Sequence, residues 1–185
     1  MSIVSDEQLV KTAREGDKAA FKELVKRLEP RVAATVYGML GRCPEAEDVG
    51  QEVFIRFYKA LNTFRGESSV ASYITRIAIN LSLNELKRRK RGYAFFSRDD
   101  DENTLDIPDP KGSGLPFEDK EIINWALQKL RPEYRSVIVL RLIEGYSTEE
   151  TANILKVPVG TVTSRLARSQ MKLKEILTPY FEDEI

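Results

Sequence analysis

The 185-residue chain contains no histidine and only one cysteine, Cys43. The absence of histidine excludes Ser-His-Asp and Cys-His nucleophilic catalysis and histidine-ligated metals, and a lone cysteine forms neither an internal disulfide nor a zinc site. The sequence also contains no P-loop, no G-x-G-x-x-G and no G-x-S-x-G motif. These absences favour a binding protein over an enzyme, with no catalytic residue, no cofactor and no metal. Cys43 precedes Pro44, and we expect it to be a small buried or capping residue at a helix start.

Long apolar runs are missing as well. No run approaches the roughly 18 residues that cross a bilayer, and the N-terminus lacks a basic start followed by an apolar stretch. Hydrophobic residues make up 42% of the chain and charged residues 31%, which is typical of a folded globular protein. We therefore expect a cytoplasmic protein.

The formal net charge is zero, but the basic residues are concentrated in two stretches. Residues 87–91 are five consecutive cations, and residues 156–174 contain five cations and no acid. A phosphate backbone responds to local stripes of this kind more than to total charge. Between them, residues 93–116 are rich in Asp, Asn, Pro, Gly and Ser, which predicts a flexible acidic linker between an N-terminal domain, 1–92, and a C-terminal domain, 117–185.

Both domains are predicted to be entirely helical, because apolar residues recur at spacings of three and four and no strand-like alternation appears. Ser5 with Gln8 and Ser147 with Glu150 form capping-box patterns. We expect a kink or a short break at Pro30. Further helices are expected at 44–61, 70–91, 117–130, 132–144, 147–155 and 159–177, with a loop at 65–69.

The two helices at 147–155 and 159–177 are separated by a short turn, which is the pattern of a helix-turn-helix. We expect the two helices to pack through apolar side chains, namely Ala152, Ile154, Leu155, Val159, Val162 and Leu166. The second helix then presents hydroxyls and guanidiniums that can reach base edges and phosphates: Thr161, Thr163, Ser164, Arg165 and Arg168. The alternative is a plain helical hairpin with a solvated face.

The long helix at 70–91 carries an aromatic, amide and cationic face, formed by Tyr73, Arg76, Asn80, Asn84, Lys87 and Arg88. Such a face can stack on, hydrogen-bond to and neutralise single-stranded nucleic acid. Alternatively, Tyr73 is partly buried and the cations solubilise the helix end. The opposite side is expected in the core: Ile74, Ile77, Ala78, Leu81 and Leu86.

A second helical stripe holds Glu45, Asp48 and Glu52, followed by Arg56. These side chains predict either ion pairs at a spacing of four residues on a wet surface or a polar surface for a protein partner. A metal-dependent enzyme acting on nucleic acid through the carboxylates of Glu45, Glu47, Asp48 and Glu52 is a further alternative, although the sequence supplies neither a nucleophile nor a second set of ligands.

The order of three segments resembles the extracytoplasmic-function (ECF) group of bacterial sigma factors. The segments are AEDVGQEVFIRFYKALNTFRGESS (46–69), SYITRIAINLSLNELKRRKR (72–91) and the long segment 130–177, which contains YSTEETANILKVPVGTVTSRLARSQ. The resemblance extends from about Asp6 to Leu177, with the linker unmatched. It implies a sigma factor without catalytic activity that binds core RNA polymerase and directs promoter-specific initiation of transcription.

The resemblance also implies roles by position. The expected contacts to core polymerase are Asp48, Gln51, Glu52, Arg56 and Lys59. The expected contacts to the −10 element are Arg65, Ser68, Ser69, Tyr73, Arg76, Asn80, Asn84, Lys87 and Arg88. The expected contacts to the −35 element are Thr161, Thr163, Ser164, Arg165 and Arg168. The implied partners are core RNA polymerase, promoter DNA and an anti-sigma factor, with no small-molecule substrate and a monomeric free state.

The chain departs from the family pattern at four places. The family usually has an aromatic residue where Val70 stands, Trp-Leu where Tyr73 and Ile74 stand, a larger apolar residue at Gly50 and a basic residue at Thr163. The promoter sequence is therefore not predicted. A stand-alone helix-turn-helix regulator that never binds polymerase is the remaining alternative, and it leaves the N-terminal motifs unexplained.

Overall fold

The computed structural model describes residues 4–96 and 118–181. The predicted linker therefore lies outside the described residues except at its first four positions, which continue a helix. The predicted all-helical class is confirmed, since the described residues contain helices and no strand. In chain order the elements are α1 (Asp6–Arg14), α2 (Lys18–Leu40), α3 (Pro44–Ala60), the short 3₁₀ helix η1 (Leu61–Thr63), α4 (Val70–Phe96), α5 (Asp119–Lys129), α6 (Pro132–Ile138), the π-helical segment η3 (Val139–Ile143), α7 (Thr148–Leu155) and α8 (Val159–Phe181).

Local signals fix most of the helix ends. The predicted capping boxes at Ser5 and Ser147 are both present, with the serine hydroxyl accepting from the third amide of each helix. Asp17 caps α2 by accepting from two amides. Cys43 is the N-cap residue of α3, as expected, although its side chain makes no capping hydrogen bond.

Two predicted boundaries were wrong, and a third prediction was wrong in part. We expected a kink or a short break at Pro30; α2 is continuous through this residue, so the break is absent. Pro179 likewise lies inside α8, which continues to Phe181 instead of ending at Leu177. The long helix α4 runs to Phe96, five residues beyond its predicted end. A proline inside a helix removes one backbone hydrogen bond, and both α2 and α8 continue through theirs despite that loss.

The N-terminal domain packs α2, α3 and α4 around a core in which Leu24, Met39, Phe57 and Ile74 are fully buried, while α1 lies against α2. Val70, the family's usual aromatic position, is also buried at the start of α4. The chain therefore uses that side chain for packing rather than for contact with a ligand.

The C-terminal domain has two small clusters. Val137, Ala152 and Val162 form one, with Leu155 and Leu166 packed against it, and Leu127, Leu130 and Ile138 form the other. The expected packing partners are thus confirmed with two exceptions. Val159 is exposed, and Ile154 is buried in the N-terminal core cluster rather than in its own domain.

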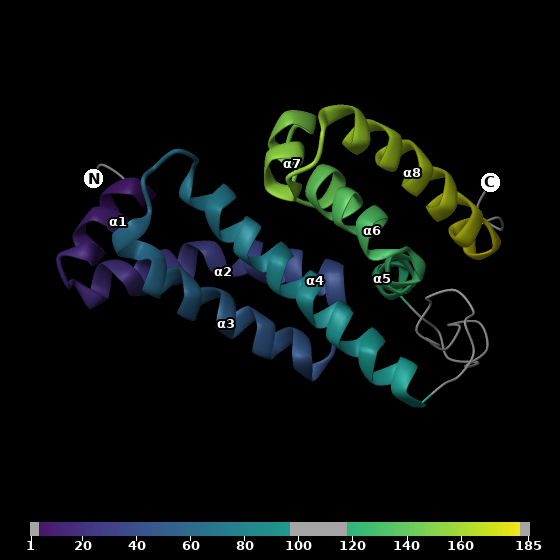
Figure 1. The fold of residues 1–185 in the computed structure, drawn as a ribbon, viewed down its shortest axis with the longest axis horizontal. Coiled ribbons are helices and arrows are strands. Elements are labelled where there is room, and N and C mark those ends of the chain that lie inside the picture. The colour runs from purple at the N-terminus through teal and green to yellow at the C-terminus, as the bar shows by residue number, and fades with distance from the viewer. Residues whose placement is uncertain (1–3, 97–117, 182–185) are drawn as a thin grey trace.

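The two domains lie in direct contact. Figure 1 shows α5–α8 lying along one side of the N-terminal helices. The contacts join the C-terminal part of α2 to α5, α6 and η3, and join α4 to α6 and α7. This contact explains why Thr75, Ile79 and Ser82 of α4 are buried beside the predicted core residues, since two sides of α4 are covered.

Candidate nucleic-acid interface

The predicted reading face of α8 is oriented by two buried residues. Val162 and Ser169 are fully buried, and the Ser169 hydroxyl lies 3.3 Å from the carbonyl oxygen of Tyr134 in α6. These anchors turn the opposite side of α8 outward. Thr163, Ser164 and Arg168 are exposed, whereas Thr161 and Arg165 are half-buried.

The turn before α8 sets the crossing of the two helices. Lys156 has a φ of 55°, and the Val157 amide donates to the Ala152 carbonyl at 3.1 Å. A left-handed residue with such a backward bond ends α7 abruptly. The small Ala152 side chain then lies against Val162, so α8 begins directly beside α7 as a helix-turn-helix requires.

The hydroxyls on α8 already have local partners. Thr163 donates to the carbonyl of Val159 at 3.3 Å, and Ser164 donates to the carbonyl of Thr161 at 3.1 Å. Their oxygen lone pairs remain available as acceptors. Short hydroxyls held in this way can accept from the amino groups of cytosine or adenine in a major groove.

A second group of predicted residues surrounds one pocket at the start of α4. The pocket, called here the Tyr73 pocket, is lined from the N-terminal domain by Arg65, Ser68, Ser69, Tyr73 and Arg76 among others. Tyr73 is half-buried, and its ring packs edge-on against Phe64 with centroids 4.9 Å apart. The partial burial expected for Tyr73 is therefore confirmed, and the residue also lines the pocket, while its contact with nucleic acid stays a prediction.

Residues from α7 complete the Tyr73 pocket. Glu150, Asn153 and Ile154 of the C-terminal domain lie on its wall. Sequence reasoning did not place these residues at a pocket, since Glu150 was expected only in the capping box and Ile154 only in the packing between two helices. The four remaining predicted residues of α4, Asn80, Asn84, Lys87 and Arg88, are exposed farther along the helix and do not line this pocket.

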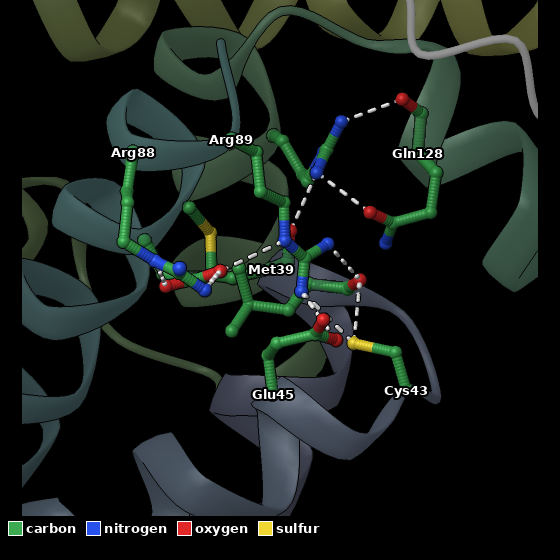
Figure 2. Close-up of polar contacts among 9 residues, drawn as sticks. Met39, Cys43, Glu45, Arg88, Arg89 and Gln128 are labelled. Carbon is green, nitrogen blue, oxygen red and sulfur yellow. Dashed lines mark hydrogen bonds and ion pairs between the residues drawn. The ribbon is translucent and has the colours of Figure 1, made fainter. Parts of the chain in front are cut away.

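The basic end of α4 is partly neutralised by internal ion pairs. Arg88 and Arg89 both pair with Glu85, at 2.7 Å and 3.1 Å, and Arg88 most strongly lowers the pKa of that carboxyl. Arg89 also donates to the Cys43 thiol at 3.0 Å and lies 3.4 Å from Glu45 (Figure 2). Part of the five-cation run thus holds the start of α3 against α4.

The predicted polymerase-binding stripe lies on α3. Glu52 and Arg56 form an ion pair at 2.8 Å, while Asp48, Gln51 and Lys59 are exposed. Two apolar side chains that the prediction omitted, Ile55 and Tyr58, are about half exposed on the same helix. Exposed aromatic and aliphatic side chains beside charges favour a protein partner over a purely solvated surface.

Within residues 4–96 and 118–181, no group of three acidic or cysteine side chains is placed to hold a metal ion. In the same part of the chain, no helix is both long and apolar enough to cross a membrane.

The sequence matches two family profiles, Sigma-70 region 2 over residues 24–92 and Sigma-70, region 4 over residues 120–173. It is 34% identical to the RNA polymerase sigma-H factor of Pseudomonas aeruginosa, over 96% of each chain. It is also 34% identical to the ECF RNA polymerase sigma-E factor of Escherichia coli K12, over 95% of this chain and 96% of that one.

Among solved structures, the fold is similar to the sigma factor RpoE of Bartonella quintana in complex with the anti-sigma factor NepR. The TM-score is 0.69 with 23% identity, covering 85% of this chain and 96% of that chain. This likeness concerns the fold alone. The two matched regions and the full-length relatives show that the chain belongs to the ECF group of bacterial sigma factors, which bind core RNA polymerase and promoter DNA and direct the initiation of transcription.

Proposed function

We propose that α8 reads the −35 element, that the Tyr73 pocket and α4 bind the −10 strand, and that α3 binds core RNA polymerase. The observation that carries this proposal is the outward face of α8, which exposes hydroxyls and guanidiniums over a segment with no acidic residue from 156 to 174. An acid-free helix face suits a polyanion, because a carboxylate there would repel phosphates and lack donors for base acceptors.

The proposed roles of the side chains on α8 differ with their length. Arg168 is exposed and long enough to contact guanine or a phosphate, whereas Thr163 and Ser164 lie close to the helix and are suited to short contacts with base edges. The family usually has a basic residue at the position of Thr163, so this face carries one positive charge fewer. We therefore propose that sequence preference at −35 depends more on hydrogen bonds than on phosphate attraction.

The Tyr73 pocket has the chemistry to hold a base taken out of the stack. Tyr73 offers a ring face, Arg65 and Arg76 offer cations, and the serines of the 65–69 loop offer hydroxyls. Extruding a base costs a few kcal/mol, and stacking with hydrogen bonds recovers about 1–3 kcal/mol per base. Asn80, Asn84, Lys87 and Arg88 extend this surface along α4 for the rest of the strand.

For α3 the proposal rests on the mixture of apolar and charged side chains that the helix exposes. The Glu52–Arg56 pair and the exposed Asp48, Gln51 and Lys59 surround Ile55 and Tyr58, so the helix offers an apolar centre with a polar rim. Such surfaces are typical of protein interfaces. We further propose that the chain acts in the cytoplasm and is held by an anti-sigma factor, as the structurally similar RpoE is by NepR.

Run-off transcription tests the proposal directly. Purified core polymerase, this chain and fragmented genomic DNA from the source organism should yield transcripts whose 5′ ends share an upstream two-part element. Transcripts that depend on this chain would support the sigma role and define the promoter. A chain that neither binds core polymerase nor supports transcripts would instead be a stand-alone helix-turn-helix regulator.

The Arg168→Ala variant tests the placement of the −35 surface. If Arg168 contacts a base edge, its loss should weaken −35-dependent binding by about 1–3 kcal/mol and relax the preference at one position. The exposed neighbour Gln170, changed to Ala, is the matched control. An equal loss on all DNA sequences would indicate a phosphate contact, and no loss would contradict the placement.

A further inference from the structure

The turn that leads into the Tyr73 pocket is held by a residue of α1. The Nε of Arg14 donates to the Leu61 carbonyl at 2.6 Å, and its Nη2 donates to the Phe64 carbonyl. The two acceptors stand at the first residue of η1 and directly after its last residue. One planar side chain therefore brackets the whole η1 turn, and the two hydrogen bonds are called here the Arg14 anchor.

Both acceptors of the Arg14 anchor belong to buried residues. Leu61 is 3% exposed and Phe64 is 8% exposed. A backbone carbonyl in such surroundings needs a hydrogen-bond partner, because water has little access to it. The Leu61 carbonyl also accepts from the Phe64 amide at 3.3 Å, whereas the Phe64 carbonyl accepts from Arg14. Removal of the guanidinium therefore takes a partner away from each end of η1.

The position of Arg14 is fixed because α1 is fixed. Three apolar residues of α1 are buried in the N-terminal core cluster: Leu9, Val10 and Ala13. At the other end of the helix, Arg27 of α2 donates to the Val4 carbonyl at 2.7 Å and pairs with Asp6 at 3.2 Å. Figure 1 shows α1 beside the segment that leads into α4, in agreement with its contacts to η1. The guanidinium thus extends from a firmly packed element.

The loop that follows η1 is open to solvent. The side chains of Arg65 and Glu67 are 83% and 79% exposed and lie 4.0 Å apart. At the far end of the loop, the Ser69 hydroxyl accepts from the Ser72 amide at 3.1 Å, which fixes the start of α4. At the near end, the fixed point is the Arg14 anchor. The backbone of the loop is therefore held at its two ends, one of which depends on α1.

The Arg14 anchor also reaches the aromatic wall of the Tyr73 pocket. Phe64 accepts from Arg14 through its carbonyl and packs its ring against Tyr73, with centroids 4.9 Å apart. A shift of the Phe64 backbone would therefore move both the loop and the ring that the proposed function assigns to one extruded base. Selection between bases depends on groups that are held at fixed positions.

The helix dipole is the ordinary explanation for a cation in the last turn of α1. Lys11 and Arg14 both stand there, and a positive charge is favourable at the negative end of a helix. The dipole requires only a charge, whereas the donors of Arg14 are directed at the carbonyls of another element. Lys11→Met removes the same charge from the same turn and leaves the Arg14 anchor in place, so it separates the two explanations.

We propose that Arg14 is a positioning residue for the −10 surface, because the Arg14 anchor holds the 65–69 loop and Tyr73 in the arrangement that distinguishes one base from another. This inference rests on the proposed function of the Tyr73 pocket for its consequence, whereas the anchor on η1 is a property of the chain alone. The role requires no contact between Arg14 and DNA, since it acts through two backbone carbonyls.

Amide hydrogen exchange tests the Arg14 anchor without DNA. Arg14→Met keeps an apolar side chain at this position and removes its donors. The hydrogen-bonded Phe64 amide should exchange about tenfold faster in this variant, whereas Lys11→Met should leave its rate unchanged. Unchanged exchange in Arg14→Met would overturn the anchor. An equal acceleration at the fully buried Val53 of α3 would also overturn it, because the variant would then only destabilise the whole domain.

A promoter with one abasic site tests the consequence. On the promoter that run-off transcription defines, the holoenzyme should lose transcription when the captured base of the −10 strand is replaced by an abasic site. Arg14→Met should lower transcription about tenfold on the intact promoter. It should match the unmodified chain on the abasic promoter, because the loop there has no base to hold. Arg14→Lys should resemble Arg14→Met, since an ammonium lacks the fork that bridges two carbonyls.

Two results of this experiment would overturn the positioning role. A loss by the same factor on the intact and abasic promoters would mean that Arg14 serves only the stability of the domain, and full activity of Arg14→Lys would mean that the charge suffices. A different result bears on the proposed function. If no abasic site in the −10 strand lowers transcription by the unmodified chain, the proposed role of the Tyr73 pocket fails, and exchange of the Phe64 amide still decides the Arg14 anchor.

Discussion

The hydrogen bond between the Thr75 and Tyr146 hydroxyls should stabilise the C-terminal domain, although Thr75 belongs to α4 of the N-terminal domain. A core in a domain of fewer than about 70–80 residues rarely supplies more than 3–5 kcal/mol, so contacts with the N-terminal domain form a large share of the total. Tyr146→Phe removes the shared bond to Thr75 and the bond from Arg31. It also leaves the buried Thr75 hydroxyl without this partner. We expect a loss of about 1.5 kcal/mol.

Trp125 makes the effect measurable. It is the only tryptophan and lies in α5, so its fluorescence follows unfolding of the C-terminal domain. With an m value of about 1 kcal/mol/M in urea, a loss of about 1.5 kcal/mol should lower the midpoint by about 1.5 M. Tyr58→Phe, which alters an exposed tyrosine of α3, is the control and should leave this transition unchanged.

A double-mutant cycle isolates the bond itself. Thr75→Val keeps the shape of the side chain and removes its hydroxyl, and we expect it to cost about 1 kcal/mol. The Thr75→Val, Tyr146→Phe double variant should cost about 1 kcal/mol less than the sum of the single changes, because both remove the same bond. If the single costs simply add, the two hydroxyls do not interact and the reasoning fails.

Three further predictions concern single elements. Val162→Ala should destabilise the C-terminal domain by about 2 kcal/mol, because the residue is fully buried between α7 and α8, and a lower urea midpoint of Trp125 fluorescence would show it. Ser147→Ala should cost about 1 kcal/mol in the same assay through loss of the capping box, and an unchanged midpoint would contradict that role. Glu85 has a lowered pKa, chiefly through Arg88, so the stability that it contributes is present above its ordinary value of 4.5 and is lost as the pH falls below that value. Glu85→Gln should flatten this acid dependence in thermal unfolding, whereas an unchanged pH profile would exclude the effect.

Features with a local cause were predictable from the sequence. The capping boxes at Ser5 and Ser147, the loop before α4 and the buried Ala152–Val162 contact all follow from residues a few positions apart or on facing helices of one motif. The exposed cations and hydroxyls of α8 follow in the same way. These signals depend on residues close together in the chain, so they can be recognised from the sequence without the structure.

The contact between domains was not predictable. Ile154 was expected in the helix-turn-helix core, and Thr75 was not singled out, because periodicity shows that a side of a helix is buried but not what covers it. Arg135 and Gly38 gave no signal at all, since each acts through a carbonyl or a methyl group far away in the sequence. The π-helical turn of η3, which contains Val139, was equally unpredictable, because no residue pattern in that segment indicated a π-helix.

The end of α2 also touches the start of α3. The Arg89 guanidinium that reaches the Leu40 carbonyl also contacts Cys43, the N-cap residue of α3. One short turn is thus shared by the contact with the C-terminal domain and by the helix proposed to bind polymerase. Any ligand of α3 that prefers one arrangement of this turn therefore strengthens or weakens the contact between the two domains. Thermodynamic linkage makes this coupling reciprocal, so separation of the domains must change the affinity of that ligand by the same factor.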